Sequence, residues 1–148
     1  MSNKVKLGKI GEELVAKYFG VPINEDFYDT EKDLLLPDGT KVEVKTQNRH
    51  PTKHLLTLRA SNDRKGLNNL LKCFTVDRLI FVEYDHSDVI TLWECVNRKE
   101  YEIYTTSPAG GLITMVGFPI KNMSVLDTIT DAKLASEMRS LSSSAQFK

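Results

Sequence analysis

The fold is decided by residues 32–45, which read KDLLLPDGTKVEVK. Residues 33–36 contain a short apolar run that predicts a strand. The tripeptide Pro37-Asp38-Gly39 is a strong turn signal, and residues 40–46 predict the return strand, because valines alternate with charged residues. A three-residue loop that ends on a left-handed glycine closes such a hairpin.

The loop length also fixes which residues of the hairpin lie opposite one another. Leu34 is expected to pair with Val42, and Asp33 with Glu43. Directly paired residues share a face of the sheet, and side chains alternate between the faces along each strand. We therefore expect Asp33, Glu43 and Lys45 to converge on the face opposite to the buried leucine and valine.

Two neighbouring carboxylates repel each other, so their convergence calls for a partner. A structural ion-pair network with Lys41 and Lys45 is one interpretation. The other is a divalent-metal site, because oxygen ligands suit Mg²⁺, for which Mn²⁺ would substitute. In that case Asp33 and Glu43 hold the metal, and Lys45 orients the attacking water or stabilises the transition state.

The rest of the chain predicts helices and strands in the order α-β-β-β-α-β, followed by an α/β extension. The fold class is therefore α/β (α+β). We expect one domain over residues 1–141, with a core over about 5–85, an extension over about 86–141 and a flexible tail over 142–148. Apart from the hairpin, the predicted helices are 5–19, 63–73 and 131–141, and the predicted strands are 54–59, 78–84, 89–96, 101–104 and 112–118. In the second helix, Leu67, Leu70, Leu71 and Phe74 are expected to be buried.

Composition excludes several classes of protein. The chain has 148 residues, with 20 basic and 20 acidic side chains, which is ordinary for a globular domain. We expect no secretory signal and no segment that spans a bilayer. Two cysteines, Cys73 and Cys95, do not make a disulfide framework. We expect a cytoplasmic protein without a membrane partner.

The zero net charge hides a segregation of charges along the chain. Residues 45–72 contain seven basic residues against the single acid Asp63, whereas residues 77–102 contain seven acids against three basic residues. A solvated basic loop is one interpretation. A surface that contacts nucleic-acid phosphates is the other, and its candidate residues are Arg49, Lys53, Arg59, Arg64 and Lys65.

The hairpin resembles that of the PD-(D/E)XK nuclease superfamily, with Lys32-Asp33 followed, after nine intervening residues, by Glu43-Val44-Lys45. This hairpin is similar to the hairpin of short phage junction-resolving endonucleases. The opening helix, residues 11–19, resembles the Gly-Glu helix of archaeal resolvase-like members. The resemblance covers about residues 7–73 and departs at Lys32, where many members have proline. It implies a restriction-endonuclease-like αβββαβ core with a mixed central sheet, and a metal-dependent phosphodiesterase that acts on DNA.

A glutamate of the first helix is the third candidate metal ligand. Glu12 lies at the edge of the apolar stripe of this helix, whereas Glu13 lies nearer the solvent face. We favour Glu12, which also matches the Gly-Glu pattern of the family. Gln47 shares a face with Lys45 by alternation and is a candidate DNA contact or a solvated glutamine. His50 and His54 are expected to be surface residues, and the alternatives are that they contact phosphate or act as bases.

Together these features predict an Mg²⁺-dependent endodeoxyribonuclease, with branched DNA or a specific duplex site as the substrate. The candidate catalytic residues are Glu12, Asp33, Glu43 and Lys45. A homodimer or higher homo-oligomer is expected, because one small domain covers few base pairs. The similarity to phage enzymes suggests a phage-encoded protein. The alternative is a non-catalytic DNA-binding or protein-interaction module on a degenerate nuclease scaffold.

Overall fold

The fold is described from a computed structural model of the chain. The structure describes residues 2–23, 33–49, 55–59, 64–106 and 113–146. The elements follow one another as α1 (Asn3–Phe19), β1 (Leu34–Leu35), β2 (Lys41–Asn48), β3 (Leu55–Arg59), α2 (Arg64–Thr75), β4 (Arg78–Tyr84), β5 (Val89–Cys95), β6 (Glu102–Thr106), β7 (Ile113–Pro119), the 3-10 turn η1 (Ile120–Asn122), β8 (Met123–Thr130) and α3 (Ala132–Gln146). The first six follow the predicted α-β-β-β-α-β order.

The strands form two sheets. The central sheet has the order β1-β2-β4-β5-β8, and the second sheet has the order β3-β7-β6. β2 and β4 run parallel, whereas the other neighbouring strands of the central sheet are antiparallel. This confirms the mixed α/β class and the mixed central sheet. The third predicted strand, β3, lies in the second sheet, where it pairs with β7.

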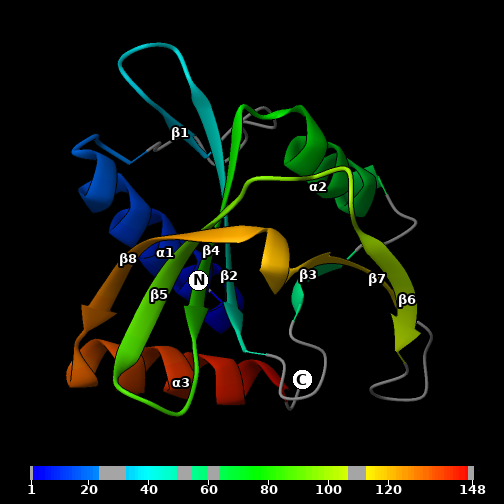
Figure 1. Cartoon of the computed structure of the whole chain (residues 1–148). Helices are drawn as coiled ribbons and strands as arrows, with labels where there is room; N and C mark the ends of the chain where they lie inside the picture. Colours follow the sequence, from blue (N-terminus) through cyan, green and yellow to red (C-terminus); the bar gives the residue numbers. More distant parts are fainter. Residues whose placement is uncertain (1, 24–32, 50–54, 60–63, 107–112, 147–148) are drawn as a thin grey trace.

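A different layer of the protein covers each face of the central sheet (Figure 1). Side chains from α1 and α3, such as Val15 and Met138, pack with Val42 and Val44 of β2 on one face. On the other face, Phe81 of β4 packs with Cys73 of α2 and with residues of the second sheet. β2 therefore presents its valines to the α1 and α3 layer, and Glu43 and Lys45 to the α2 layer.

The hairpin has the predicted register. Leu34 is paired with Val42, and the N–H of Leu36 donates to the carbonyl oxygen of Thr40 at 2.9 Å. Gly39 has φ 90°, a conformation that glycine adopts without steric cost. The side chain of Asp38 accepts the N–H of Thr40 at 2.9 Å and stabilises the turn.

Three sequence predictions need correction. The first is β8, which was not predicted. Its pairing with β5 shifts between Leu92 and Trp93, and this bulge interrupts the alternation of apolar and polar residues from which a strand is predicted. The last helix continues to Gln146, through most of the predicted tail 142–148, since no Gly or Pro interrupts it. In α2, Leu71 and Phe74 are exposed, and Cys73 is buried instead.

Among the residues that the structure describes, no helix is long and apolar enough to span a membrane.

Candidate functional site

The site begins beside β2, at the residue that precedes β1. β1 contains two residues, and its Leu34 is paired with Val42. The Oδ2 of Asp33 accepts the N–H of Val44 at 2.9 Å, and the N–H of Asp33 donates to the carbonyl oxygen of Val42 at 2.9 Å. These two bonds hold the Asp33 carboxylate beside the next side chain of that face, Glu43.

Glu43 is the buried centre of the site. It is 1% exposed, and a lysine ammonium lies near each of its carboxylate oxygens. Lys45 Nζ is 3.3 Å from Oε2, and Lys72 Nζ is 3.4 Å from Oε1. Oε1 has no hydrogen-bond partner within the described part of the chain. The two ammonium groups compensate part of the cost of burying this carboxylate.

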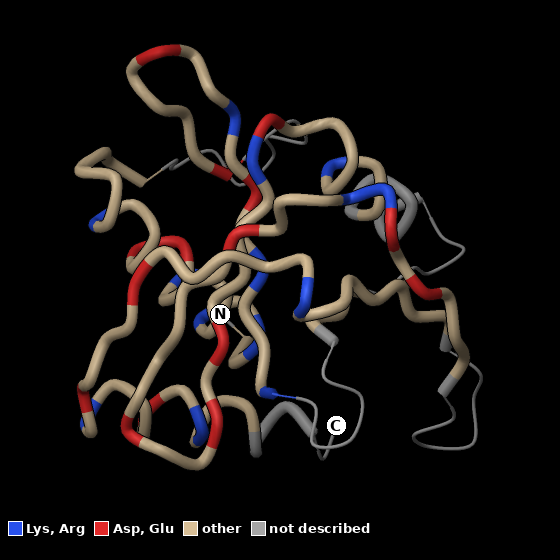
Figure 2. The backbone as a smooth tube through the Cα atoms, in the orientation of Figure 1, with Lys and Arg blue, Asp and Glu red and all other residues tan. Residues whose placement is uncertain are grey.

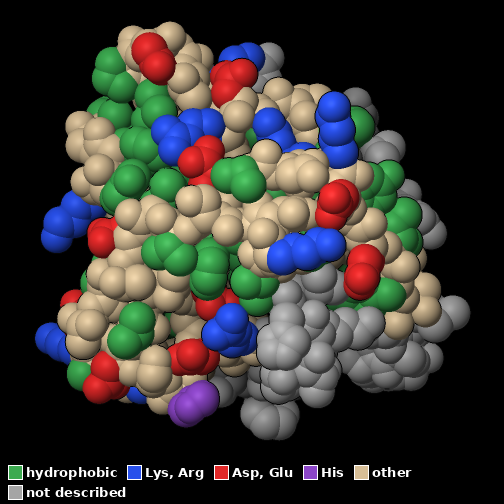
Figure 3. All heavy atoms as spheres, in the orientation of Figure 1, with side chains coloured by type: hydrophobic (Ala, Val, Ile, Leu, Met, Phe, Trp, Pro, Cys, Tyr) green, Lys and Arg blue, Asp and Glu red, His purple; other side chains and the backbone are tan. Residues whose placement is uncertain are grey.

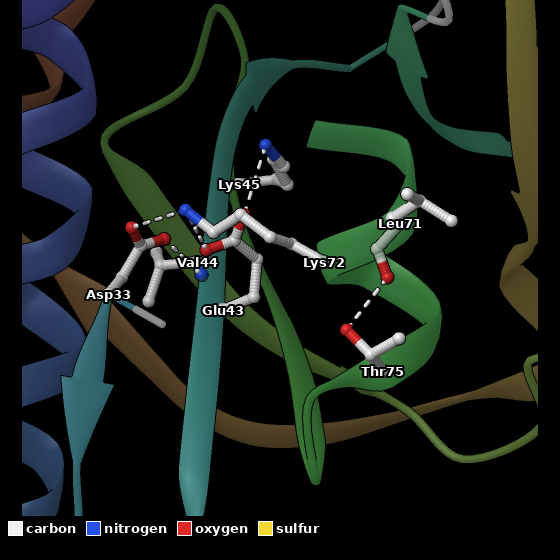
Figure 4. A network of polar contacts seen from close by, with 7 residues as sticks. All are labelled: Asp33, Glu43, Val44, Lys45, Leu71, Lys72 and Thr75. Atoms are coloured by element: carbon white, nitrogen blue, oxygen red, sulfur yellow. Dashed lines mark hydrogen bonds and ion pairs between the residues drawn. The ribbon is translucent and has the colours of Figure 1, made fainter. Parts of the chain in front are cut away.

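Lys72 comes from α2, on the far side of the site from α1. Its Nζ lies 3.7 Å from Asp33 Oδ1 as well as 3.4 Å from Glu43 Oε1, and so lies between the two carboxylates (Figure 4). The side chain is only 12% exposed. Sequence reasoning missed this residue and counted it as part of a basic surface, because it placed the buried face of α2 on Leu71 and Phe74.

Glu12 brings a third carboxylate from α1. It is half-buried, and Glu13 is exposed. Burial, followed by the negative charge of Asp33 and a side-chain hydrogen bond with Asp33, raises the pKa of Glu12 to about 7, against the opposing effects of Lys72 and Lys9. The preceding residue, Gly11, packs directly on Thr46 of β2. The structure thus places Glu12, and not Glu13, beside Asp33.

Burial also dominates the proton affinity of Glu43. Together with the hydrogen bond and charge of Asp33, it raises the pKa of this carboxyl group to about 8, while Lys45 and Lys72 act in the opposite direction. Glu12 and Glu43 therefore bind protons more readily than exposed glutamates do, and a cation bound beside them would oppose this. Cys73 lies close by, but burial raises the pKa of its thiol to about 12, so it does not supply a thiolate near neutral pH.

The chemistry of this donor set suits a hard divalent cation. Three carboxylates, from α1, from the residue before β1 and from β2, offer oxygen ligands, and the buried Oε1 of Glu43 lacks a hydrogen-bond donor among the described residues. In the described part of the chain, however, no three Asp, Glu, His or Cys side chains are arranged so that they could hold a metal ion as they stand. The ammonium of Lys72 occupies the space between two of the candidate ligands.

Two of the predicted DNA contacts have partners within the protein. The side-chain oxygen of Gln47 accepts the N–H of Thr57 at 2.8 Å, which ties β2 to β3. Arg49 is more exposed, and its Nε lies 3.6 Å from Glu83 Oε2. Glu83 is a second buried acid, on the same face as Gln47, and its Oε1 accepts the indole N–H of Trp93 at 3.3 Å.

The other members of the predicted basic surface cannot be placed. Lys53, His50 and His54 lie outside the described residues, and of Arg59, Arg64 and Lys65 only the backbone, in β3 and α2, is described. Figure 2 shows charged positions of both signs spread over the described elements, and Figure 3 shows one face on which acidic, basic and apolar side chains are interspersed.

Lys45 and Lys72, the first and last basic residues of segment 45–72, are paired with carboxylates of the site. The segment therefore offers less free positive charge than its composition suggests. Comparison of the chain with family models and with curated proteins finds no match.

Proposed function

We propose that this protein is a metal-dependent endonuclease that hydrolyses phosphodiester bonds of DNA. The observation that supports this proposal is the meeting of Glu12, Asp33 and Glu43 at the edge of β2, with Lys45 beside them. Two or more carboxylates next to a lysine suit phosphoryl transfer, in which the protein mainly positions groups and compensates charge.

The residues have distinct proposed roles. Asp33, Glu43 and Glu12 hold Mg²⁺, and Mn²⁺ substitutes for it. The metal, when bound, lowers the pKa of a water molecule and compensates the charge that develops at phosphorus. Lys45 donates hydrogen bonds to the attacking water or to a phosphoryl oxygen, and its contact with Glu43 at 3.3 Å keeps the ammonium at the site.

The proposed substrate is branched DNA or a specific duplex site. Arg49, with its partly exposed guanidinium, and the basic residues 53, 59, 64 and 65 are proposed to contact the phosphate backbone. We further propose a homodimer or a higher homo-oligomer, because a single small domain reaches few base pairs. A cytoplasmic location and a phage origin stay predictions.

The test is a cleavage assay with three substrates: supercoiled plasmid, linear duplex and a synthetic four-way junction, each with Mg²⁺, Mn²⁺ or EDTA. The expected result is cleavage that requires the metal and falls by several orders of magnitude in Glu43→Ala and Lys45→Ala. Glu13→Ala is the matched control for Glu12→Ala, because Glu13 is the exposed neighbour on the same helix. Equal cleavage by wild type and Glu43→Ala would refute the proposal.

A second function is favoured by one observation, the contacts of Lys72 with two carboxylates. Such contacts let the charges neutralise one another without a metal, as in a non-catalytic DNA-binding or protein-interaction module. This alternative predicts DNA binding, or binding of a partner, that is the same in EDTA and in Mg²⁺, and no cleavage of any of the three substrates.

A further inference from the structure

Lys72 is the residue of the site that the proposed nuclease chemistry leaves without a role. Its Nζ lies 3.7 Å from an oxygen of Asp33 and 3.4 Å from an oxygen of Glu43. These carboxylates come from different segments of the hairpin and carry like charges. A single cation that bridges them compensates both.

The side chain of Lys72 is not needed to hold α2 in place. The C-terminal end of α2 is held by Arg98, whose guanidinium donates to the carbonyl oxygens of Cys73, Val76 and Asp77 at 3.1, 2.6 and 3.2 Å. Cys73 anchors the helix in the core beneath it. α2 is therefore fixed by neighbours of Lys72, and the lysine side chain, 12% exposed, is directed into an acidic site (Figure 4).

A lysine ammonium and a divalent cation cannot share the same carboxylate oxygens without strong repulsion. The described side chains show no preformed set of metal ligands while Lys72 lies between Asp33 and Glu43. Binding of a metal by both carboxylates thus requires the ammonium to withdraw. The long, flexible stem of lysine allows such a movement, since its charge is not fixed in a planar fork as in arginine.

We propose that Lys72 is an internal cation of the site, which bridges Asp33 and Glu43 in the metal-free protein, competes with the divalent metal and is displaced when the metal binds. Lys72 is thus a positioning residue: it keeps two like charges together before the metal arrives, and it lowers the affinity for the metal. This inference rests on the proposed metal site and does not depend on whether the protein cuts DNA.

The competing explanation is that Lys72 has a purely structural role, and the two explanations predict opposite changes. If the ammonium competes with the metal, Lys72→Met, which keeps the length of the side chain and removes its charge, binds Mn²⁺ about tenfold more tightly than wild type. If Lys72 only holds the carboxylates in place, the same variant binds Mn²⁺ more weakly, because the ligands separate.

The experiment is isothermal titration calorimetry of the full chain with Mn²⁺, at a fixed pH and without DNA. Lys133→Met is the control, because Lys133 is an exposed residue of α3, and it is expected to match wild type. Affinity of Lys72→Met that is equal to or weaker than that of wild type overturns the proposal, and so does absence of Mn²⁺ binding to both proteins. Tighter binding of Mn²⁺ without any cleavage of DNA would support this inference and refute the proposed nuclease.

A second measurement uses wild type alone, in case the variant does not fold. Lysines are acetylated with acetic anhydride in EDTA and at increasing Mn²⁺, and each site is quantified by mass spectrometry. The acetylation of Lys72 is expected to rise with Mn²⁺ saturation, because the displaced amine reaches solvent, whereas that of Lys133 stays constant. A Lys72 signal that does not change on Mn²⁺ binding overturns the proposal.

Discussion

Gly11 of α1 lies so close to Thr46 of β2 that a Cβ atom at position 11 would overlap the Thr46 hydroxyl group. Thr46 faces α1, while its neighbour Lys45 faces the opposite side of the sheet, where Glu43 lies. The absence of a side chain at Gly11 lets the helix approach the strand, and Glu12 follows directly. The close contact of Gly11 with Thr46 therefore brings the helix carboxylate to the site.

Gly11→Ala is expected to weaken both the fold and the site. The added methyl group pushes α1 away from β2, and overpacking of this kind lowers the free energy of unfolding by about 1–3 kcal/mol. Glu12 moves away from Asp33 with its helix, so the affinity for Mn²⁺ falls as well. Thermal unfolding and calorimetric titration with Mn²⁺ measure the two effects.

Gly8→Ala is the matched control, because a Cβ at this position of the same helix meets no atom within 4 Å. It is expected to raise the free energy of unfolding by about 0.5–1 kcal/mol, as alanine is the better helix former. In the double variant Gly11→Ala with Thr46→Ala, the hydroxyl that causes the overlap is gone, and we expect part of the lost stability to return. If Gly11→Ala and Gly8→Ala raise the free energy of unfolding equally, the close contact of Gly11 with Thr46 does not affect stability.

A second prediction separates the two glutamates of α1. Glu12→Gln removes a charged ligand beside Asp33 and is expected to weaken Mn²⁺ binding by about 10–100-fold, a range that even outer-shell changes reach at metal sites. Glu13→Gln changes an exposed residue of the same helix and is expected to bind Mn²⁺ as wild type does. Calorimetry with both variants checks this, and equal losses in the two would show that only the net charge of the helix matters.

Local sequence rules were enough to predict the hairpin and the residues that it brings together. The turn at Pro37-Asp38-Gly39 fixes the pairing of Leu34 with Val42, and from this pairing the shared face of Asp33 and Glu43 follows by alternation. The order of the first six elements could be predicted for the same reason, because each has its own periodicity and its own end signals.

Long-range contacts could not be predicted in this way. β8 pairs with β5 across a bulge, so its apolar residues Leu126 and Ile129 lie three apart and not two. In the part of α2 whose side chains are described, Cys73 is buried and its neighbour Lys72 enters the site, whereas the more hydrophobic Leu71 and Phe74 are exposed. Which face a helix buries depends on the partner that it meets, and a single sequence does not show that partner.

A third prediction concerns the support of α2 by Arg98. Arg98→Met removes the donors to three carbonyl oxygens that follow or end the helix. Because two of these oxygens lose a charged donor in a partly buried place, we expect a loss of about 1–3 kcal/mol in the free energy of unfolding. Urea unfolding measures it, with Lys99→Met, an exposed neighbour, as the control. Equal stability of the two variants would contradict the role of Arg98.

The last prediction is a pH dependence of the metal-free protein. The pKa values of Glu12 and Glu43 are raised from 4.5 to about 7 and about 8, mainly by burial. Between pH 4.5 and 8 the native protein therefore holds more protons at these groups than the unfolded chain does. Their contribution to the free energy of unfolding is greatest below pH 4.5 and falls as the pH rises through this window.

Thermal unfolding in EDTA at pH values from 5 to 9 measures this dependence as a midpoint that falls with rising pH. The Glu43→Gln variant has no ionisable group at this position, so its unfolding midpoint is expected to fall less with rising pH than that of wild type. The Glu13→Gln variant, changed at an exposed position, is the control. Saturating Mn²⁺ is expected to flatten the wild-type curve, because the metal binds the ionised carboxylates and stabilises the native state more at high pH. The same fall in Glu43→Gln as in wild type would show that other groups dominate the titration.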